Sequence, residues 1–192
     1  CKGKKLYDKR ENLKKKEEHR EFLEVLKKKD IRIYKTTNKI FEDLTDTENT
    51  QGIIGVVKFK QRSLEENLTD ENRFVLILDR IQDPGNMGTI IRTADAAGVD
   101  AIIALKGCVD IYNPKTIRST MGSLYRVPFI YVDSLSVTVL ELKKRGVYFY
   151  AAHLKGTKYY DEFDFTLEGG TAFLIGNEGN GLSDEIANAA DS

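Results

Sequence analysis

Cysteine and histidine are scarce in this sequence of 192 residues. The two cysteines, Cys1 and Cys108, exclude a disulfide framework, and no CxxC pair or Cys/His cluster has the spacing of zinc ligands. The two histidines, His19 and His153, leave little room for histidine-based catalysis. We therefore expect a protein of a reducing cytoplasm that uses no metal.

Long apolar runs are also missing. No run approaches the ~20 residues that a membrane helix needs, and the first ten residues, CKGKKLYDKR, lack the apolar core of a secretory signal. Hydrophobic residues make up 41% of the chain and charged residues 31%, which is typical of a soluble globular protein rather than a disordered one. The length suits one domain with a small appendage, or two small domains.

The formal net charge is zero, but the charges are unevenly distributed. Residues 1–40 hold 15 basic and 7 acidic residues, whereas the rest of the chain holds 15 basic and 23 acidic ones. A basic arm on an acidic body indicates a polyanionic partner such as nucleic acid, with Lys14, Lys15 and Lys16 as phosphate contacts. The alternative is a solvated Lys/Glu-rich helix over residues 11–29, and the two interpretations are compatible.

The chain changes character near residue 74. Residues 31–60 suggest short β elements, and the polar residues 61–72 suggest a linker. Beyond them, apolar runs alternate with segments of helical spacing, which predicts a parallel sheet with helices on both faces. The expected strands are 74–79, 101–105, 129–132, 147–152 and 171–175, and the expected helices are 88–98, 134–145 with Ser134 as its N-cap, and the segment that Ser183 caps.

Two polar loops follow strands of this predicted sheet. DPGNMG (83–88) comes after the first strand and GNEGNG (176–181) after the last. Ligands of open α/β sheets bind at the carboxyl ends of the strands, so both loops are candidate site segments. The glycine order is not that of a dinucleotide fingerprint, which gives an oxidoreductase little support, and the sequence contains neither a Walker loop nor a G-x-S-x-G motif.

Each polar residue of these segments also has a simpler explanation. The second loop could be a connector, Asn86 a turn former, and Glu178 a cap of the following helix. Arg92 could pair with Asp95 or with a phosphate. Their combination is more specific than any one of them.

Two stretches carry a family resemblance. LDRIQDPGNMGTIIRTADAAGVDAIIAL (78–105) and FLIGNEGNGLSDE (173–185) resemble the first and second signatures of the SpoU (TrmH-type) RNA 2′-O-ribose methyltransferases of the SPOUT superfamily. NPKTIRSTMGSLYRVPF (113–129) fits the same pattern. Residues 1–62 resemble part of a small L30e-like substrate-binding domain, which leaves 63–72 as a linker and 73–192 as the methyltransferase domain.

The resemblance implies transfer of a methyl group from S-adenosylmethionine to a ribose 2′-hydroxyl of structured RNA, with rRNA favoured over tRNA. Arg92 would act on the hydroxyl, as a base or by stabilising the alkoxide. Asn86 would orient Arg92 or the ribose, and Glu178 would hold its loop and support Arg92. The cofactor pocket would include Ala152, Gly176, Asn177 and Gly179, and Arg118 and Ser119 would contact RNA. A noncatalytic RNA-binding module on the same scaffold is the alternative function.

The resemblance also implies a C-terminal trefoil knot and a homodimer formed through it. The family has a third signature after the second, an Ile-Pro-Met run followed by Ser-Leu-Asn, and this sequence reaches ANAADS (187–192) where that segment should begin. We therefore expect the knot to be incomplete in this chain, and a polypeptide ending at Ser192 to bind S-adenosylmethionine poorly.

Overall fold

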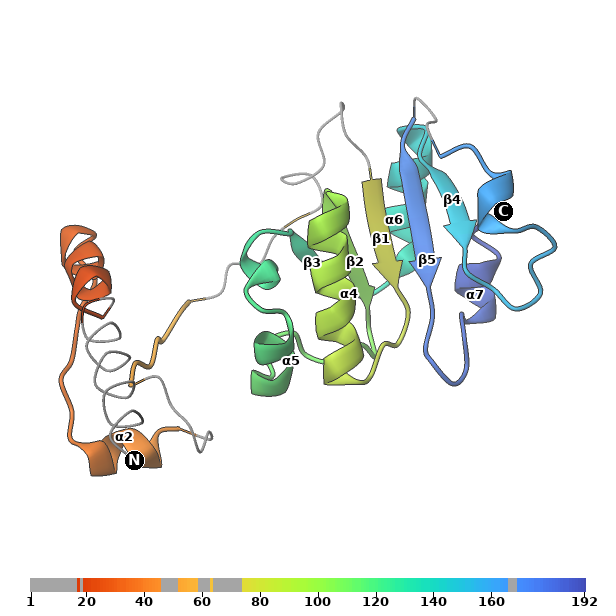
Figure 1. Cartoon of the computed structure of the whole chain (residues 1–192). Helices are drawn as coiled ribbons and strands as arrows, with labels where there is room; N and C mark the ends of the chain where they lie inside the picture. Colours follow the sequence, from red (N-terminus) through yellow and green to blue (C-terminus); the bar gives the residue numbers. More distant parts are fainter. Residues whose placement is uncertain (1–16, 18, 46–51, 59–62, 64–73, 166–168) are drawn as a thin grey trace, which may run out of the picture. The chain divides into compact units, whose positions relative to one another are not determined.

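The computed structural model describes residue 17 and residues 19–45, 52–58, 63, 74–165 and 169–192. The chain divides into two compact units, Cys1–Lys58 and Phe59–Ser192 (Figure 1). The predicted phosphate contacts Lys14, Lys15 and Lys16 lie outside the described residues, as does all of the predicted linker except Ser63.

The described part of the N-terminal unit is helical where it is regular. Residues 19–28 form a helix, as the Lys/Glu-rich pattern predicts, and a second helix, α2, spans Asn38–Asp43. The prediction of β elements over 31–60 is wrong for the described residues, since 31–37 and 52–58 form no strand. The Thr37 hydroxyl accepts a hydrogen bond from the Ile40 N–H and so starts α2 within this region.

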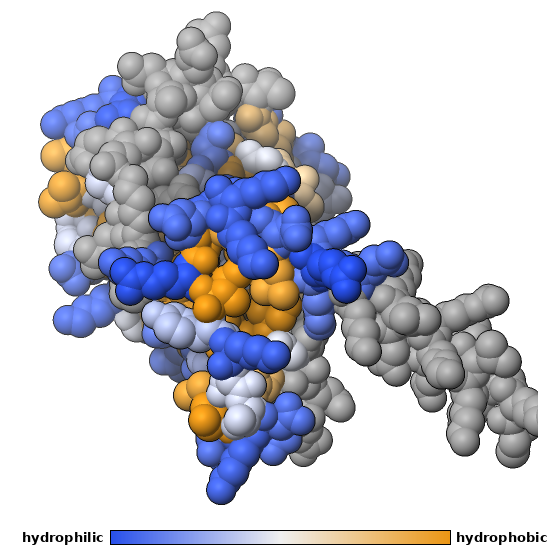
Figure 2. Space-filling view, turned by 90° about the vertical axis from the view of Figure 1, so that its left-hand side faces the viewer, coloured by the Kyte–Doolittle hydropathy of each residue, from blue (hydrophilic) through white to orange (hydrophobic). Residues whose placement is uncertain are grey.

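Apolar side chains of this unit lie at its surface. No described residue of the unit is buried, and Tyr34 and Val56 are 81% and 99% exposed. Figure 2 shows apolar side chains gathered among hydrophilic ones on one face of the molecule. The described residues of this unit therefore enclose no apolar core of their own.

The C-terminal unit is built on a sheet of five parallel strands in the order β3-β2-β1-β5-β4 (Figure 1). All five predicted strands are confirmed, with ends that differ by at most one residue. The central strand β1 pairs with β2 and β5, and its last residue, Leu78, lies opposite Ala104 and Ile175. The carboxyl ends of these strands therefore meet at one edge. The strands are β1 (Phe74–Leu78), β2 (Ala101–Leu105), β3 (Phe129–Val132), β4 (Tyr148–Ala151) and β5 (Thr171–Ile175).

Helices cover both faces of the sheet, as predicted. Helix α4 (Pro84–Ala97) packs Met87 and Ile91 against alternate residues of the central strands, and α5 (Pro114–Ser119) lies beside α4 (Figure 1). On the other face, α6 (Leu135–Lys144) and α7 (Asp184–Ala187) contribute to a second apolar cluster around Ile77 and Ile103. Strands buried on both faces explain the continuous apolar runs of the sequence. Two single turns of 3-10 helix, η1 (Ser123–Tyr125) and η2 (Tyr160–Glu162), complete the described elements.

Helix α4 begins earlier than predicted. The expected helix started at residue 88, but Asp83 is the N-cap: its Oδ1 accepts from the Asn86 N–H over 2.8 Å, and Pro84 occupies the first turn. The predicted loop 83–88 is therefore the cap and first turn of α4, because Asp followed by Pro is a strong helix start. Gly98 ends the helix in the left-handed conformation, with φ of 72°, as predicted.

The N-caps predicted for α6 and α7 both occupy the expected positions, but only one of them makes a capping hydrogen bond. Ser134 caps α6 as expected, and its hydroxyl accepts from the Ser136 N–H. Ser183 occupies the N-cap position of α7, but its side chain makes no capping hydrogen bond. Helix α7 is shorter than the predicted SDEIANAA segment and ends at Ala187.

Candidate functional site

The two predicted site segments lie side by side at the carboxyl edge of the sheet. One runs from the end of β1 into the first turn of α4, and the other follows β5, the neighbouring strand. The Asn86 side chain donates from Nδ2 to Oε1 of Glu178 over 2.7 Å, although 92 positions separate the two residues. Both side chains are exposed, so this pair faces solvent where a ligand can reach it.

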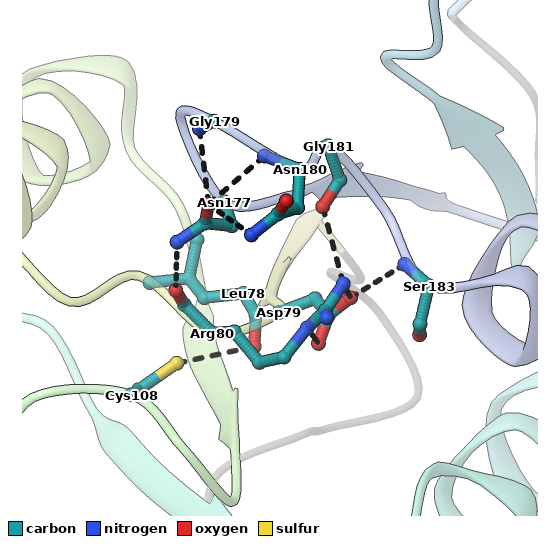
Figure 3. Close-up of polar contacts among 9 residues, drawn as sticks. All are labelled: Leu78, Asp79, Arg80, Cys108, Asn177, Gly179, Asn180, Gly181 and Ser183. Carbon is teal, nitrogen blue, oxygen red and sulfur yellow. Dashed lines mark hydrogen bonds and ion pairs between the residues drawn. The ribbon is translucent and has the colours of Figure 1, made fainter.

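The loop after β5 is held in shape by Asn177. Oδ1 of its side chain accepts from the backbone N–H groups of Gly179 and Asn180, over 2.9 and 3.0 Å (Figure 3). Its Nδ2 donates to the Arg80 carbonyl over 2.9 Å, and its backbone pairs with Gly181 in both directions. The Asn177 side chain thus points into the protein and fixes the loop, while Glu178 and Gly179 stay exposed.

Glycine is required at two places in this loop. A Cβ on Gly176 would lie 2.2 Å from the Gly181 carbonyl carbon, which no side chain tolerates. Gly181 has φ of 64°, in the left-handed region. These two glycines serve the tight turn itself, which explains part of the glycine content that the sequence shows.

A buried carboxylate that the sequence analysis did not single out supports this loop. Asp79, directly after β1, is 3% exposed. Its Oδ2 accepts from the Ser183 N–H over 2.8 Å, and Arg80 approaches Oδ1 through Nε over 3.1 Å (Figure 3). Arg80 also donates to the Gly181 carbonyl over 3.4 Å. Burial of a charge is costly unless it is paired and hydrogen-bonded, and here both conditions are met.

The signal that could have revealed this group was present in the sequence. Asp79 is an acidic residue at the end of a continuous apolar strand, where the chain emerges at the carboxyl edge. Arg80 beside it has φ of 54°, unusual for a residue with a side chain. Together they tie the end of β1 to both ends of the loop that follows β5.

Cys108 packs against the same strand end. Its Sγ donates to the Leu78 carbonyl over 3.5 Å (Figure 3). Burial raises the pKa of the Cys108 thiol above its ordinary value. A thiol held protonated is a packing group rather than a nucleophile.

Arg92 lies apart from the Asn86–Glu178 pair. Residues six positions apart on a helix differ by roughly 120° around its axis, and no hydrogen bond joins Arg92 to Asn86. Arg92 is exposed and makes no hydrogen bond or ion pair with the described residues. Its predicted alternative partner, Asp95, is instead bound by Arg126, whose Nε lies 2.8 Å from Oδ2.

The two residues predicted to contact RNA on α5 have different surroundings. Arg118 is exposed in the last turn of the helix. The Ser119 hydroxyl lies 2.9 Å from the Pro84 carbonyl and 2.7 Å from the Thr116 carbonyl, so its hydrogen is shared within the protein. A Cβ on Gly88 would lie 1.8 Å from this hydroxyl, so Gly88 is what allows α5 to approach α4. Ser119 therefore joins two helices.

Ala152 follows β4 at the same edge as the loop after β5. Its N–H donates to the Leu174 carbonyl over 3.1 Å, which extends the pairing of β4 with β5, and its side chain is exposed. The exposed surfaces of Ala152, Glu178 and Gly179 thus follow two neighbouring strands. The small side chain of Ala152 and the bare backbone of Gly179 leave room for the close approach of a nucleoside.

Among the described residues, no group of three or more His, Cys, Asp and Glu side chains is placed to hold a metal ion. No described helix has the length and apolar character to cross a bilayer.

Comparison with known proteins connects this geometry to a family. The profile of the SpoU rRNA Methylase family matches residues 73–192, which include the sheet and both site segments. This chain belongs to the SpoU family. A second profile, for RNA 2′-O ribose methyltransferase substrate binding, matches residues 4–63. The family resemblance expected from the two signatures is confirmed.

Relatives within the SpoU family include named rRNA enzymes. The chain is 37% identical over 161 residues to the 23S rRNA (guanosine(2553)-2′-O)-methyltransferase RlmP of Bacillus subtilis, which covers 84% of this chain and 62% of the relative. It is 33% identical over 168 residues to the 23S rRNA (guanosine-2′-O-)-methyltransferase RlmB of Neisseria meningitidis. This alignment covers 85% of this chain and 66% of the relative. The chain therefore spans about two thirds of the length of these relatives or less.

Solved SpoU structures share the fold. The SpoU methyltransferase AviRb of Streptomyces viridochromogenes, in complex with AdoMet, aligns with a TM-score of 0.73 at 28% identity, over 82% of this chain and 61% of AviRb. An AdoMet-bound rRNA methyltransferase from Sinorhizobium meliloti aligns with a TM-score of 0.73 at 32% identity, over 81% of this chain and 59% of that enzyme. The SpoU fold expected for residues 73–192 is thus confirmed.

Proposed function

We propose that this protein transfers a methyl group from S-adenosylmethionine to the 2′-hydroxyl of a ribose in ribosomal RNA. The observation that carries the proposal is the hydrogen bond between Asn86 and Glu178, which joins the two signature segments at one exposed site. The relatives named as 23S rRNA methyltransferases support rRNA over tRNA as the substrate.

S-adenosylmethionine supplies a methyl group that is already activated by a sulfonium, so that a C–O bond to the ribose forms as the C–S bond breaks. The residues that would hold it are Gly176, Asn177 and Gly179 after β5 and Ala152 after β4. The fit rests on the loop that Asn177 closes on itself, because its shape is fixed before a ligand arrives. Preorganisation of this kind lowers the entropic cost of binding.

The ribose hydroxyl is a poor nucleophile and must lose its proton to solvent as the bond forms. A guanidinium stays protonated at neutral pH, so we assign Arg92 the stabilisation of the ribose oxygen and the anchoring of the adjacent phosphate. Arg92 suits this task because its guanidinium forms no ion pair with a described carboxylate. Asn86 and Glu178 would fix the edge of the site rather than contact Arg92 within this chain.

The remaining residues would bind the RNA. Arg118 presents an exposed charge on α5, and Lys14, Lys15 and Lys16 add basic charge in the N-terminal arm. Residues 1–62 would bind RNA, 63–72 would link them to the catalytic unit, and 73–192 would carry the chemistry. We further propose a cytoplasmic homodimer that forms through a knotted C-terminal region.

The test is transfer of tritium from labelled S-adenosylmethionine to rRNA by the full-length protein. Arg92→Ala should reduce the rate by about a hundredfold or more, the scale of a group that stabilises charge on a reacting oxygen. Arg145→Ala is the matched control, because Arg145 pairs with Glu141 on α6 at the opposite face of the sheet. RNA binding without any transfer by the unmodified protein would instead support a noncatalytic module.

A further inference from the structure

A second arginine, Arg126, binds the acidic residue that lies closest to Arg92 along α4. Its Nε lies 2.8 Å from Oδ2 of Asp95, and its Nη2 contacts the same oxygen and the Ser123 hydroxyl, the latter over 3.0 Å. Arg126 directly follows the turn η1, so this pair fastens η1 to α4. The Asp95 side chain is 21% exposed.

Asp95 is also a natural partner for Arg92. Residues three positions apart on a helix are neighbours, so the spacing allows an Arg92–Asp95 ion pair, although the order with the acidic residue first is the more favourable one. Arg92 nevertheless makes no ion pair with the described residues, while Asp95 is bound by Arg126. Hydrogen bonds from Arg126 and Ser123 lower the pKa of Asp95, so the carboxylate is charged at neutral pH. Without Arg126, that charge would attract the nearest free guanidinium.

We propose that Arg126 is a positioning residue that occupies Asp95 and thereby keeps the Arg92 guanidinium available to the RNA. The inference rests on the role proposed for Arg92. A guanidinium bound to a carboxylate has its charge compensated and its donors engaged. It would then stabilise a ribose oxygen or a phosphate less well. Arg126 acts through Arg92 and needs no contact with the substrate.

The first experiment measures kcat for methyl transfer in the full-length protein with four variants. Arg126→Ala should lower kcat by about two- to threefold, the effect expected when a helical ion pair of modest strength competes for Arg92. Asp95→Asn should stay close to the unmodified rate. The double variant Arg126→Ala/Asp95→Asn should recover that rate, because no carboxylate is left to capture Arg92. Arg126→Lys should also retain it, since a cation still covers Asp95.

The outcomes separate this inference from the proposed function. If Arg92→Ala keeps the normal rate, the role of Arg92 is wrong. If Arg92→Ala is inactive but the double variant is as slow as Arg126→Ala, Arg126 serves only to hold η1 and the inference is overturned. An unchanged rate in Arg126→Ala would overturn it as well. Thermal unfolding of each variant shows whether the fold is intact.

A second readout does not depend on activity. The pKa of the Asp95 carboxyl can be followed by NMR in Arg126→Ala and in Arg126→Ala/Arg92→Ala. We expect it to stay below the ordinary value in the first variant, because Arg92 moves onto Asp95. In the second variant it should return toward the ordinary value. Equal pKa values in the two variants would show that Arg92 does not respond to the loss of Arg126.

Discussion

Asn86 and Glu178 are joined by a hydrogen bond of 2.7 Å across 92 positions of sequence. One belongs to the first turn of α4 and the other to the loop after β5, so the bond closes the site at the junction of two adjacent strands. Each residue alone has a local explanation as a turn former or a cap. Their contact shows that the two signature segments form one structural unit.

This contact predicts a measurable coupling. Asn86→Ala and Glu178→Ala should each lower the free energy of unfolding by about 1 kcal/mol, the usual contribution of such a bond. The double variant should cost less than the two single losses together, because either change already removes the bond. Urea unfolding measures all three variants. The control is the pair Asn86→Ala and Glu185→Ala, since Glu185 is exposed on α7. If the losses in unfolding free energy are as additive for Asn86 and Glu178 as for this control pair, the coupling is contradicted.

Gly176 should not tolerate a side chain. In Gly176→Ala the new Cβ would lie 2.2 Å from the Gly181 carbonyl carbon, so the loop must shift. We expect a loss of stability of about 1–3 kcal/mol, as for other overpacked sites, together with weaker S-adenosylmethionine binding in calorimetry. Gly179→Ala is the matched control for stability, because its Cβ would lie 3.5 Å from Oδ1 of Asn177, an ordinary van der Waals contact. Equal destabilisation of the two variants would refute the steric argument.

Asp79 should matter to the loop that follows β5 without touching a ligand. Asp79→Asn keeps a similar shape but removes the charge that binds Arg80 and accepts from the Ser183 N–H. We expect a loss of about 2 kcal/mol in the free energy of unfolding, below the 3–5 kcal/mol typical of a fully buried pair because Arg80 is 37% exposed. Urea unfolding measures it, with the exposed Asp184→Asn as control. A KM for S-adenosylmethionine that stays unchanged while stability falls would show that the loop keeps its shape without Asp79.

The Asp95–Arg126 pair predicts a pH dependence. The pKa of Asp95 is lowered in the folded protein from an ordinary value of 3.8, chiefly by hydrogen bonds from Arg126 and Ser123. Its contribution to stability is therefore fully present above pH 3.8 and is lost as the pH falls through the lower, folded pKa. The difference in unfolding free energy between the unmodified protein and Asp95→Asn should be constant near neutrality and shrink below pH 3.8. A difference that grows on acidification would contradict this sign.

Local patterns were sufficient to predict the sheet. Each strand is a short apolar run, and Gly98 and Ser134 mark helix ends through conformations and hydrogen bonds that involve only near neighbours. The alternating IRIYK segment was wrongly predicted as a strand, because strand formation depends on a distant partner and not only on near neighbours. Alternation predicts a strand only where a partner strand is available, and the described residues 31–37 have none.

The site was predictable in its segments but not in its contacts. That the segments around Asn86 and Glu178 would meet was expected because each follows a strand of the predicted parallel sheet and because each resembles a family signature. The network from Asp79 to Ser183 spans 104 positions and leaves no periodic signal. The pairing of Asp95 with Arg126 rather than Arg92 depends on where η1 lies against α4. Spacing along the helix makes Arg92 the expected partner of Asp95, but tertiary packing places Arg126 there instead.

The place of β5 in the sheet has a consequence for synthesis of the protein. Of the five described strands, β5 is synthesised after the other four, yet it lies between β1 and β4. Until it arrives, the edge of β1 has no partner and β4 has no neighbour in the sheet, and unpaired edges are where nascent chains associate wrongly. Insertion of β5 joins β4 to the other described strands and brings Glu178 to Asn86 in the same event, so a chain that lacks β5 has neither the continuous sheet nor the contact between the two signature segments.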